Sequence, residues 1–295
     1  MPNNFVCFGE VLWDVFPHKA IIGGAPLNVA LRLHALGKNV EMISRVGRDK
    51  LGSDLVSYME NQSLSIEFVQ RDPEFATGEV TVHLDENGSA TYDIEFPRAW
   101  DFISVTEKHL DLLFSADVLV FGSLAARHQT TRNALHICLQ SANFSVFDVN
   151  LRKPHYDLDW VGGIIEKVHF TKCNDEELTE ICSYFGSPDH DVKANLRFLS
   201  QRSGCQKICV TRGKNGAMLL FDGQLYENPG YSVKVVDTVG SGDSFLATLL
   251  AFLDSENPQT ALDYACAMGA LVAATSGAIA AVSLDEVKKL VAQGN

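Results

Sequence analysis

The sequence predicts an α/β protein with a mostly parallel central β-sheet, and three observations lead to this expectation. Short, continuous apolar runs typical of fully buried strands recur along the 295 residues. Amphipathic stretches of helical period separate these runs, and this alternation is typical of parallel sheets covered on both faces. Apolar residues make up 46% of the chain and charged residues 21%, which describes a globular protein with an ample core.

The expected elements follow one another along the chain. Strands are predicted at residues 5–8, 40–46, 118–122, 145–149, 168–171 and 208–211. Helices are predicted at residues 27–36, 51–61, 130–140, 192–201 and 245–253. One region departs from this rhythm, because residues 79–84 and 90–96 alternate polar and apolar side chains around an Asn-Gly pair at 87–88. That pattern predicts a half-exposed hairpin, which is expected to cover a cleft or, alternatively, to form the edge of a dimer.

The net charge argues against some classes of partner, and the cysteine pattern is typical of buried thiols. A net charge of −13 argues against an extended nucleic-acid or anionic-membrane surface, although it leaves room for a local phosphate site. Cysteine occurs seven times with no CxxC pair, and Cys7, Cys138, Cys209 and Cys266 lie in apolar surroundings typical of buried thiols. No basic segment precedes the first apolar run and no uncharged apolar stretch is long enough to span a bilayer. We therefore expect a cytoplasmic protein that binds neither nucleic acid nor membrane.

The most informative stretch is residues 237–247 (Asp-Thr-Val-Gly-Ser-Gly-Asp-Ser-Phe-Leu-Ala), where a turn with Gly240 and Gly242 leads directly into an apolar run. Glycines allow a tight turn and a close approach of the backbone to a ligand. The first turn of a helix has unpaired N–H groups and a positive dipole end, which suit phosphate oxygens. Asp243 can cap this helix, or it can take a proton from a hydroxyl held beside the phosphate. The other motifs favour the second interpretation.

Residues 22–30 (Ile-Gly-Gly-Ala-Pro-Leu-Asn-Val-Ala) form a second glycine cluster, with a proline near the start of a predicted helix. Gly23 and Gly24 allow a polyol to approach the backbone, and Asn28 then offers a donor and an acceptor to the same space. The alternative is an ordinary helix start with a solvated asparagine. Asp14 follows the carboxyl end of strand 5–8, where open α/β sheets bind ligands. Its carboxylate can accept paired hydrogen bonds from a sugar, or it can be a loop charge.

Together these motifs resemble those of the ribokinase-like (PfkB) carbohydrate kinases, and among them the bacterial fructokinases. The likeness covers residues 5 to about 287, and its two principal motifs, at 23–28 and 237–245, stand far apart in the family's order. Further similar segments are 47–52 (Gly-Arg-Asp-x-x-Gly), 77–78 (Thr-Gly), 148–152 (Asp-x-Asn-x-Arg), 174–177 (Asn-x-x-Glu) and 211–216 (Thr-Arg-Gly-x-x-Gly). The resemblance implies a ribokinase-like three-layer αβα sandwich. It also implies a single domain, 1–295, with a small β lid from about 12–22 and 79–96.

The resemblance implies a role for each matching position on the sugar side. Asp243 would be the base that deprotonates the acceptor hydroxyl. Backbone N–H groups of Gly240, Ser241 and Gly242 would hold charge on the transferred phosphoryl group, each contributing about 3 kcal/mol. Residues expected to bind the sugar are Asp14, Gly23, Gly24, Asn28, Asp148, Asn150 and Arg152. Arg152 could contact sugar or γ-phosphate, and a local ion pair with Asp148 is the alternative.

The resemblance also places the nucleotide and the metal ions. Asn174 and Glu177 would organise Mg²⁺, largely through water; from the residues alone they are an N-cap and its capping-box partner, and the two roles are compatible. Residues expected at the ATP site are Asn174, Thr211, Arg212, Gly213, Gly216, Gly240, Gly242 and Cys266, with Arg212 close to the triphosphate. Relatives can hold K⁺ with main-chain carbonyls of the segments that contain Asp237, Val239 and Gly277 here.

Two positions depart from the family pattern. Cys266 stands where many relatives carry asparagine near the adenine edge, which leaves the base contacts and the purine preference open. Ala280 stands where the segment 277–281 usually has proline. Because carbonyl ligands need no particular side chain, the sequence neither confirms nor excludes K⁺.

Other chemistries lack their motifs. The chain has no GxxxxGK[ST], no HExxH, no cysteine–histidine cluster and no GxSxG, and residues 240–245 lack the third glycine of a dinucleotide fingerprint. The resemblance therefore implies a sugar kinase that uses ATP and Mg²⁺ to phosphorylate a primary hydroxyl of a hexose, with fructose at O6 as the first expectation. Ribose, 2-keto-3-deoxygluconate and nucleosides are alternatives within the family. Alternatives of other classes are a non-catalytic sugar sensor and a structural oligomer, and the hairpin 79–96 could join two copies in a homodimer.

Overall fold

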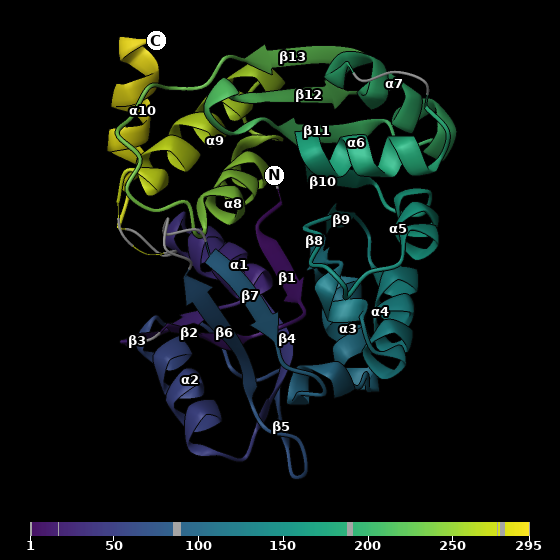
Figure 1. Cartoon of the computed structure of the whole chain (residues 1–295), viewed down its shortest axis with the longest axis vertical. Helices are drawn as coiled ribbons and strands as arrows, with labels where there is room; N and C mark the ends of the chain where they lie inside the picture. Colours follow the sequence, from purple (N-terminus) through teal and green to yellow (C-terminus); the bar gives the residue numbers. More distant parts are fainter. Residues whose placement is uncertain are drawn as a thin grey trace.

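The computed structural model describes residues 2–16, 18–84, 90–187, 191–275, 277 and 281–294, and the statements below refer to these residues. A large central sheet runs through the molecule, with a smaller sheet beside it (Figure 1). The strands of the central sheet are β1 (Asn4–Phe8), β4 (Asn39–Gly47), β5 (Val69–Asp72), β8 (Val118–Gly122), β9 (Ser145–Asp148), β10 (Phe170–Asn174), β11 (Lys207–Thr211), β12 (Ala217–Phe221) and β13 (Gln224–Asn228). Their order is β13-β12-β11-β10-β9-β8-β1-β4-β5. All neighbours from β11 to β5 are parallel, and β12 and β13 continue the sheet antiparallel.

Helices cover both faces of this sheet. The α-helices are α1 (Ala25–Ala35), α2 (Lys50–Asn61), α3 (Glu107–Ser115), α4 (Gln129–Ser141), α5 (Leu158–Ile165), α6 (Asp175–Tyr184), α7 (Val192–Ser203), α8 (Ser241–Phe252), α9 (Pro258–Ala273) and α10 (Leu284–Gln293). Short 3₁₀ turns are η1 (Ala99–Phe102), η2 (Leu124–Ala126) and η3 (Gly213–Asn215). Side chains of α1, α8 and α9 pack in one apolar cluster with the sheet, and side chains of α3 to α7 pack in another.

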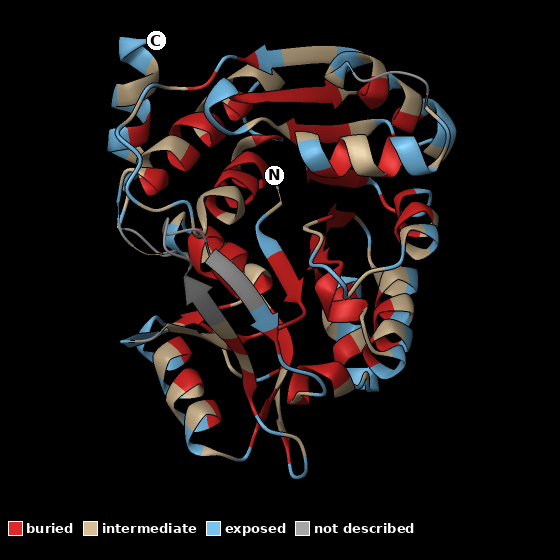
Figure 2. Ribbon diagram, viewed as in Figure 1, coloured by how far each residue is buried: buried red, intermediate tan, exposed pale blue. Residues whose placement is uncertain are grey.

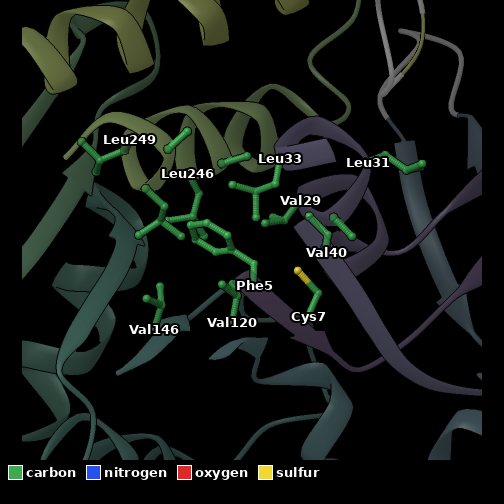
Figure 3. Close-up of a cluster of buried hydrophobic side chains, with 14 of the residues drawn as sticks. Phe5, Cys7, Val29, Leu31, Leu33, Val40, Val120, Val146, Leu246 and Leu249 are labelled. Atoms are coloured by element: carbon green, nitrogen blue, oxygen red, sulfur yellow. The ribbon is translucent and has the colours of Figure 1, made fainter. Parts of the chain in front are cut away.

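Successive side chains of β1 point to opposite faces of the sheet and pack against different helix layers. Phe5 and Cys7 belong to the cluster with α1 and α8, whereas Val6 and Phe8 belong to the opposite cluster. Figure 3 shows Phe5 between the strands and the α8 side chain Leu246. Full burial of one such side chain contributes about 1.5–3 kcal/mol. The strands of the central sheet are mostly buried while the outer faces of the helices are exposed (Figure 2). The predicted three-layer αβα sandwich with a mostly parallel sheet is confirmed.

The smaller sheet combines two distant segments of the chain. Its strands are β2 (Leu12–Phe16), β3 (Lys19–Gly23), β6 (Gly78–Leu84) and β7 (Ala90–Ile94), in the order β3-β2-β6-β7. The β6–β7 pair is antiparallel, as the alternating pattern predicts, and the turn expected at 85–89 lies outside the described residues. β2 pairs with β3 antiparallel and with β6 parallel. The assignment of this sheet as the lid of a single domain stays a prediction.

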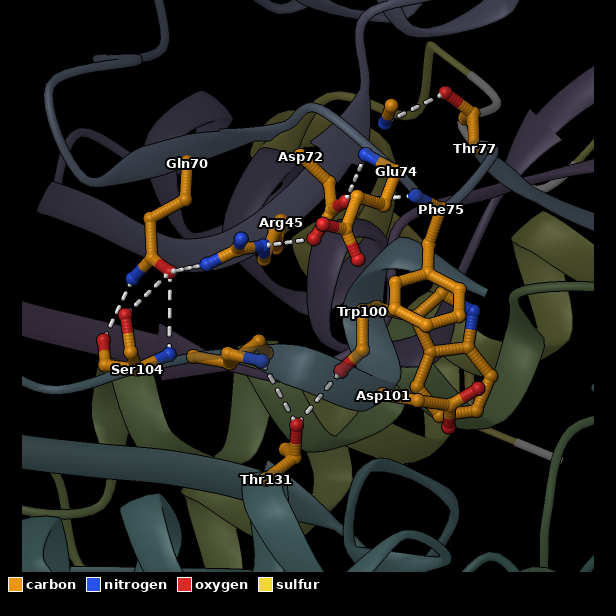
Figure 4. Close-up of polar contacts among 12 residues, drawn as sticks. Arg45, Gln70, Asp72, Glu74, Phe75, Thr77, Trp100, Asp101, Ser104 and Thr131 are labelled. Atoms are coloured by element: carbon orange, nitrogen blue, oxygen red, sulfur yellow. Dashed lines mark hydrogen bonds and ion pairs between the residues drawn. The ribbon is translucent and has the colours of Figure 1, made fainter. Parts of the chain in front are cut away.

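A polar network fixes the start of β6 to the central sheet. The Asp49 carboxylate accepts hydrogen bonds from the Thr77 N–H at 2.8 Å and the Thr77 hydroxyl at 2.6 Å, and from the Gly52 N–H at 2.7 Å. Nearby, Asp72 at the end of β5 forms a 2.5 Å ion pair with Arg45 of β4 and accepts the N–H groups of the loop that follows (Figure 4). The family-like segments 47–52 and 77–78 therefore lie at the junction of the two sheets.

Strand β10 corrects one expectation. The apolar pattern predicts a strand at 168–171, but β10 runs from Phe170 to Asn174. Val168 instead donates its N–H to Ile164 O at the end of α5. The strand continues through Lys172, whose charge breaks the apolar pattern, although the residue is only 6% exposed.

Two further properties concern the chain as a whole. Within the described part of the chain, no helix is both long and apolar enough to cross a bilayer. Each of the cysteines is a buried free thiol, including the four expected from their apolar surroundings.

Candidate active site

Two cavities in the described part of the chain meet at the N-terminus of α8. The large cavity, of about 810 Å³, lies between the 211–216 loop, the segment 229–238 and helices α8 and α9. The small cavity, of about 470 Å³, lies between the carboxyl ends of central strands, the start of α1 and the smaller sheet. Residues that line both cavities are Asn174, Thr211, Thr238 and Gly242. Two ligands can therefore meet at this boundary.

Asp243 lines the small cavity at the third position of α8. The helix starts after Gly240, which has a left-handed φ of 73° and supplies no side-chain cap. Asp243 does not act as a cap either, because its Oδ2 accepts a 2.8 Å hydrogen bond from Asn28 Nδ2 of α1. Burial, and then the charge of Asp148, raise the pKa of Asp243 to about 6. A carboxyl group with this pKa can exchange a proton close to neutral pH.

Ser241 and Gly242 hold the start of α8 in place. The Ser241 hydroxyl donates to Gly269 O of α9 at 2.9 Å, and the Ser241 N–H donates to Thr238 O at 3.2 Å. Of the amides predicted to stabilise a phosphoryl group, that of Ser241 is therefore already engaged in a turn. Gly242 lines both cavities, and a Cβ at this position would lie 3.4 Å from Lys172 Nζ.

Lys172 is a site residue that the sequence analysis missed. Its Nζ lies 2.9 and 3.1 Å from the two carboxylate oxygens of Asp148, and both residues are buried. Burial alone would lower the pKa of Lys172, but the carboxylates of Asp148, Glu177 and Asp243 raise it above its usual value. Lys172 lines the small cavity, whereas Asp148 is not among the described residues that line either cavity. Asp148 pairs with this lysine rather than with Arg152. A lysine inside an apolar strand is the signal that could have identified Lys172.

The other residues predicted to bind the sugar surround the small cavity. Asp14, Gly24, Asn150 and Arg152 line it, although Asp14 lies in β2 rather than in a loop after β1. Burial raises the pKa of Asp14 to about 6. Gly23 packs directly against the Asp14 carboxylate, so that a Cβ on Gly23 would collide with Asp14 Oδ2. Apolar side chains that complete the lining are Leu12, Phe16, Val80, Ile94 and Leu124. The smaller sheet thus supplies one apolar wall.

Asn174 and Glu177 form a capping box at the start of α6. Asn174 Oδ1 accepts the Glu177 N–H at 2.7 Å, and Glu177 Oε2 accepts the Asn174 N–H at 2.9 Å. Glu177 Oε1 accepts a third backbone bond, from Leu151, at 2.8 Å. Burial raises the pKa of Glu177. The predicted cap is confirmed, and the predicted Mg²⁺ role stays a prediction; within the described residues no cluster of three His, Cys, Asp or Glu side chains could hold a metal ion.

The large cavity contains most of the residues predicted for the nucleotide. Thr211, Gly213, Gly216 and Cys266 line it together with apolar side chains of α9. Arg212 is not among the described lining residues, because its guanidinium group donates to Asn228 O at 3.3 Å.

The loop geometry explains two features of this cavity. Lys214 lines the cavity in place of Arg212 and was missed by the sequence analysis. Gly216 has φ 76°, and a Cβ there would collide with the backbone of Asn228 and Gly230. Only glycine fits this close approach.

The predicted K⁺ segments lie next to one another. Asp237 Oδ1 accepts the Val239 N–H at 3.0 Å, and Asp237 Oδ2 accepts the Gly277 N–H at 3.2 Å. Ala280, the second departure from the family pattern, lies outside the described residues. The cation itself stays a prediction.

Glu10 is a second residue that the sequence analysis missed. It follows β1, lines the small cavity and is only 2% exposed. Burial raises the pKa of Glu10 to about 7, although Arg152 and Arg127 oppose this shift. An acidic residue directly after a buried strand is the signal that could have found it.

Comparisons with known proteins agree with this geometry. The sequence model of the pfkB family carbohydrate kinases matches residues 5–285. Fructokinase-2 of Oryza sativa subsp. japonica is 28% identical over 312 residues, which span 95% of this chain and 91% of that protein. A fructokinase of Salmonella typhimurium is 27% identical over 295 residues, which span 93% and 94% of the two chains.

Solved structures support the fold. The fructokinase with bound ATP from Xylella fastidiosa superposes with a TM-score of 0.87 at 21% identity, over 99% of each chain. A structure described as a putative ribokinase II from E. coli has a TM-score of 0.86 at 20% identity, over 99% and 100% of the two chains. Because the family match extends over nearly the whole sequence, the chain belongs to the pfkB family of carbohydrate kinases.

Proposed function

We propose that the protein transfers the γ-phosphate of ATP to the primary O6 hydroxyl of fructose, giving fructose 6-phosphate and ADP. The observation that carries this proposal is the position of Asp243, beside a helix N-terminus where two ligand-sized cavities meet. A volume of about 810 Å³ fits a nucleotide, and about 470 Å³ fits a monosaccharide. The relatives named fructokinase support the choice of sugar.

The proposed reaction begins with the sugar in the small cavity. Its primary hydroxyl donates a hydrogen bond to Asp243, which removes the proton as the oxygen attacks the γ-phosphorus. The new O–P bond forms while the bond from phosphorus to the β–γ bridging oxygen breaks, and ADP leaves with that electron pair. Asp243 then holds the proton. The backbone amides of Gly240 and Gly242 and the ammonium group of Lys172 stabilise the negative charge of the phosphoryl group in transit.

Asn174 and Glu177 have the oxygen donors that Mg²⁺ prefers. The carboxylate oxygens of Glu177 already accept the N–H groups of Asn174 and Leu151, and Asn174 Oδ1 accepts the Glu177 N–H, so these residues would hold the ion through water. Bound Mg²⁺ would neutralise part of the triphosphate charge. For K⁺, carbonyls near Asp237, Val239 and Gly277 would provide the ligands, which requires no particular side chain.

Charge in the small cavity favours a neutral acceptor. Glu10, Asp14 and Asp243 face the cationic side chain of Arg152, while Lys172 is paired with Asp148. A sugar acid such as 2-keto-3-deoxygluconate would bring another carboxylate among these carboxyl groups, and like charges at close range are destabilising. This arrangement supports fructose or ribose over a sugar acid. A non-catalytic sensor would have no need for a base at an anion site.

Three further expectations complete the proposal. The smaller sheet would act as a lid of a single domain, because Val80 and Ile94 form a wall of the small cavity. The same sheet would join two copies in a homodimer, which light scattering can measure. Buried free thiols suit a reducing compartment such as the cytoplasm.

The test is ADP release with ATP, Mg²⁺ and a panel of fructose, ribose, 2-keto-3-deoxygluconate and a nucleoside. We expect fructose to give the highest kcat/KM. Asp243→Asn should lower kcat by about 10³-fold because the base is lost, while fructose still binds in calorimetry. Asp222→Asn, at the exposed β12–β13 turn, is the control and should match the parent. A near-parental rate in Asp243→Asn would show that the base assignment is wrong, and fructose binding without ADP release in the parent would favour the sensor.

A further inference from the structure

Two buried oxygen atoms beside the small cavity have no hydrogen-bond partner. They are Glu10 Oε2 and Asn28 Oδ1, and their residues are only 2% and 6% exposed. Both residues line the small cavity. A buried polar atom without a partner is unfavourable, because it loses its bonds to water and gains none in return. Since both atoms are shielded from bulk water, a group bound in the cavity is the partner that can satisfy them.

The fold brings these two residues together from separate elements. Glu10 follows β1, and Asn28 lies in the first turns of α1. Gly24 precedes α1, and a Cβ on it would lie only 2.5 Å from the Glu10 carbonyl oxygen. The missing side chain of Gly24 therefore lets the Glu10 backbone pack against the start of the helix.

The amide nitrogen of Asn28 already donates a hydrogen bond. Its Nδ2 donates to Asp243 Oδ2 at 2.8 Å, which fixes the orientation of the amide and leaves Oδ1 as an acceptor. Asp243 takes the hydroxyl that becomes phosphorylated. A group held by Asn28 Oδ1 is consequently a different hydroxyl of the same acceptor.

We propose that Glu10 is a specificity-determining residue that, together with Asn28 Oδ1, binds a second hydroxyl of the acceptor sugar. This inference rests on the proposed function. A hydroxyl can donate its hydrogen to Asn28 Oδ1 and accept a hydrogen bond from a protonated Glu10 carboxyl group, so that both oxygen atoms gain a partner. An acceptor without a hydroxyl at this position leaves both atoms unpaired, and sites of this kind discriminate strongly against such analogues.

The charge state of Glu10 agrees with this arrangement. Burial raises its pKa to about 7, and the charged groups that act on it are Arg152, Asp243 and Arg127. Asp243 raises the pKa, and the two arginines lower it. Below about pH 7 the carboxyl group is protonated and can donate. Above that pH it can only accept, and it then competes with Asn28 for the single hydroxyl hydrogen, so sugar binding weakens.

The test measures KM for fructose, KM for ATP and kcat at pH 6 and pH 8. Glu10→Ala should raise KM for fructose about tenfold at pH 6, with kcat and KM for ATP within about threefold of the parent. Glu10→Gln keeps a hydrogen-bond donor, so its KM should stay close to that of the parent at pH 6 and should lack the parent's rise at pH 8. Glu41→Gln is the matched control, because Glu41 Oε2 is also buried and unpartnered, yet Glu41 lines neither cavity. We expect no change in this control.

A KM for fructose within twofold of the parent in Glu10→Ala, with only the melting temperature lowered, would overturn the inference. If Glu10→Ala fails to fold, a rise in KM between pH 6 and pH 8 in Glu10→Gln equal to that of the parent overturns it instead. The proposed function fails separately, when the parent releases no ADP with any sugar. Calorimetry of fructose binding at pH 6 and pH 8 then still tests the role of Glu10. The parent should bind fructose more weakly at pH 8 than at pH 6, and Glu10→Gln should not.

Discussion

The two cavities that meet at Gly242 are lined by different chemistry. The small cavity, of about 470 Å³, is lined by several ionisable side chains, namely Glu10, Asp14, Arg152, Lys172, Glu177 and Asp243. Small or apolar residues make up much of the lining of the large cavity, and Lys214 is its charged side chain among the described lining residues. Its small residues are Gly213, Gly216, Gly230, Ser232, Ser241, Gly242, Cys266, Gly269, Ala270 and Ala273. One cavity is built for recognition by side chains, and the other for close approach of the backbone.

This difference teaches where a substitution should matter. In the small cavity, removing an atom removes a charge or a hydrogen bond, so truncation changes the chemistry. In the large cavity, a glycine has no side chain to remove, and the sensitive change is the addition of a Cβ. Substitutions in the small cavity should therefore change mainly the KM for fructose. Substitutions in the large cavity should change mainly the KM for ATP.

The largest expected effect comes from Lys172→Met. The variant leaves the Asp148 carboxylate buried without its 2.9 Å partner, and breaking a buried pair in this way costs about 3–5 kcal/mol. Urea unfolding at pH 7.5 measures the loss. Adding Asp148→Asn removes the unpaired charge, so the double variant should recover much of the stability while kcat stays low, because Lys172 lines the small cavity. A single variant as stable as the parent would contradict the importance of this pair.

Gly216→Ala tests the large cavity and should have a smaller effect. The residue has φ 76°, and the added Cβ would collide with the backbone of Asn228 and Gly230. We expect KM for ATP to rise about tenfold, since the backbone of the loop must move by about 1 Å, while KM for fructose stays within about threefold.

Gly213→Ala is the matched control for this loop. Gly213 also lines the large cavity with a positive φ of 53°, but open space surrounds its Cβ position. The control therefore carries only the backbone strain, of about 1 kcal/mol, without the collision. A larger rise of KM for ATP in Gly213→Ala than in Gly216→Ala would show that strain, rather than backbone contact, controls the loop.

The features that could be predicted from the sequence depend mostly on local patterns. The capping box of Asn174 and Glu177 and the glycine turn before Asp243 depend on neighbours three or four residues away, and the structure contains both. The strand and helix periodicity likewise depends on near neighbours, so the order of the layers could be predicted. The boundaries of β10 could not, because Lys172 interrupts the apolar run and is tolerated only through Asp148.

Side-chain direction and long-range pairing explain the remaining differences. The Asp148–Lys172 pair joins adjacent strands across 24 positions, which no local spacing indicates. Arg212 belongs to the expected loop, but its guanidinium group turns to Asn228 O rather than to the cavity. The position of Glu10 after a buried strand is a local signal, but its unpartnered Oε2 and its packing against Gly24 at the start of α1 depend on the fold. These are properties of the packed fold rather than of a sequence window.

The smallest expected effect is a change in the acid side of the pH profile. The pKa values of Asp243 and Asp14 are both raised to about 6 by burial. The base must be ionised to accept a proton, and an ionised Asp14 is the better acceptor for sugar hydroxyls, so kcat/KM for fructose should fall as the pH drops through 6. In the Glu10→Gln background, in which residue 10 no longer titrates, kcat/KM at pH 6 should be about fourfold below its plateau near pH 7.5, because both aspartates are half-ionised at pH 6. In Asp14→Asn the ratio of the two values should shrink to about twofold, because one titrating group is gone. The background removes the titration of Glu10, whose pKa is about 7, so an unchanged fourfold ratio in Asp14→Asn would mean that the ionisation of Asp14 has no part in acceptor binding.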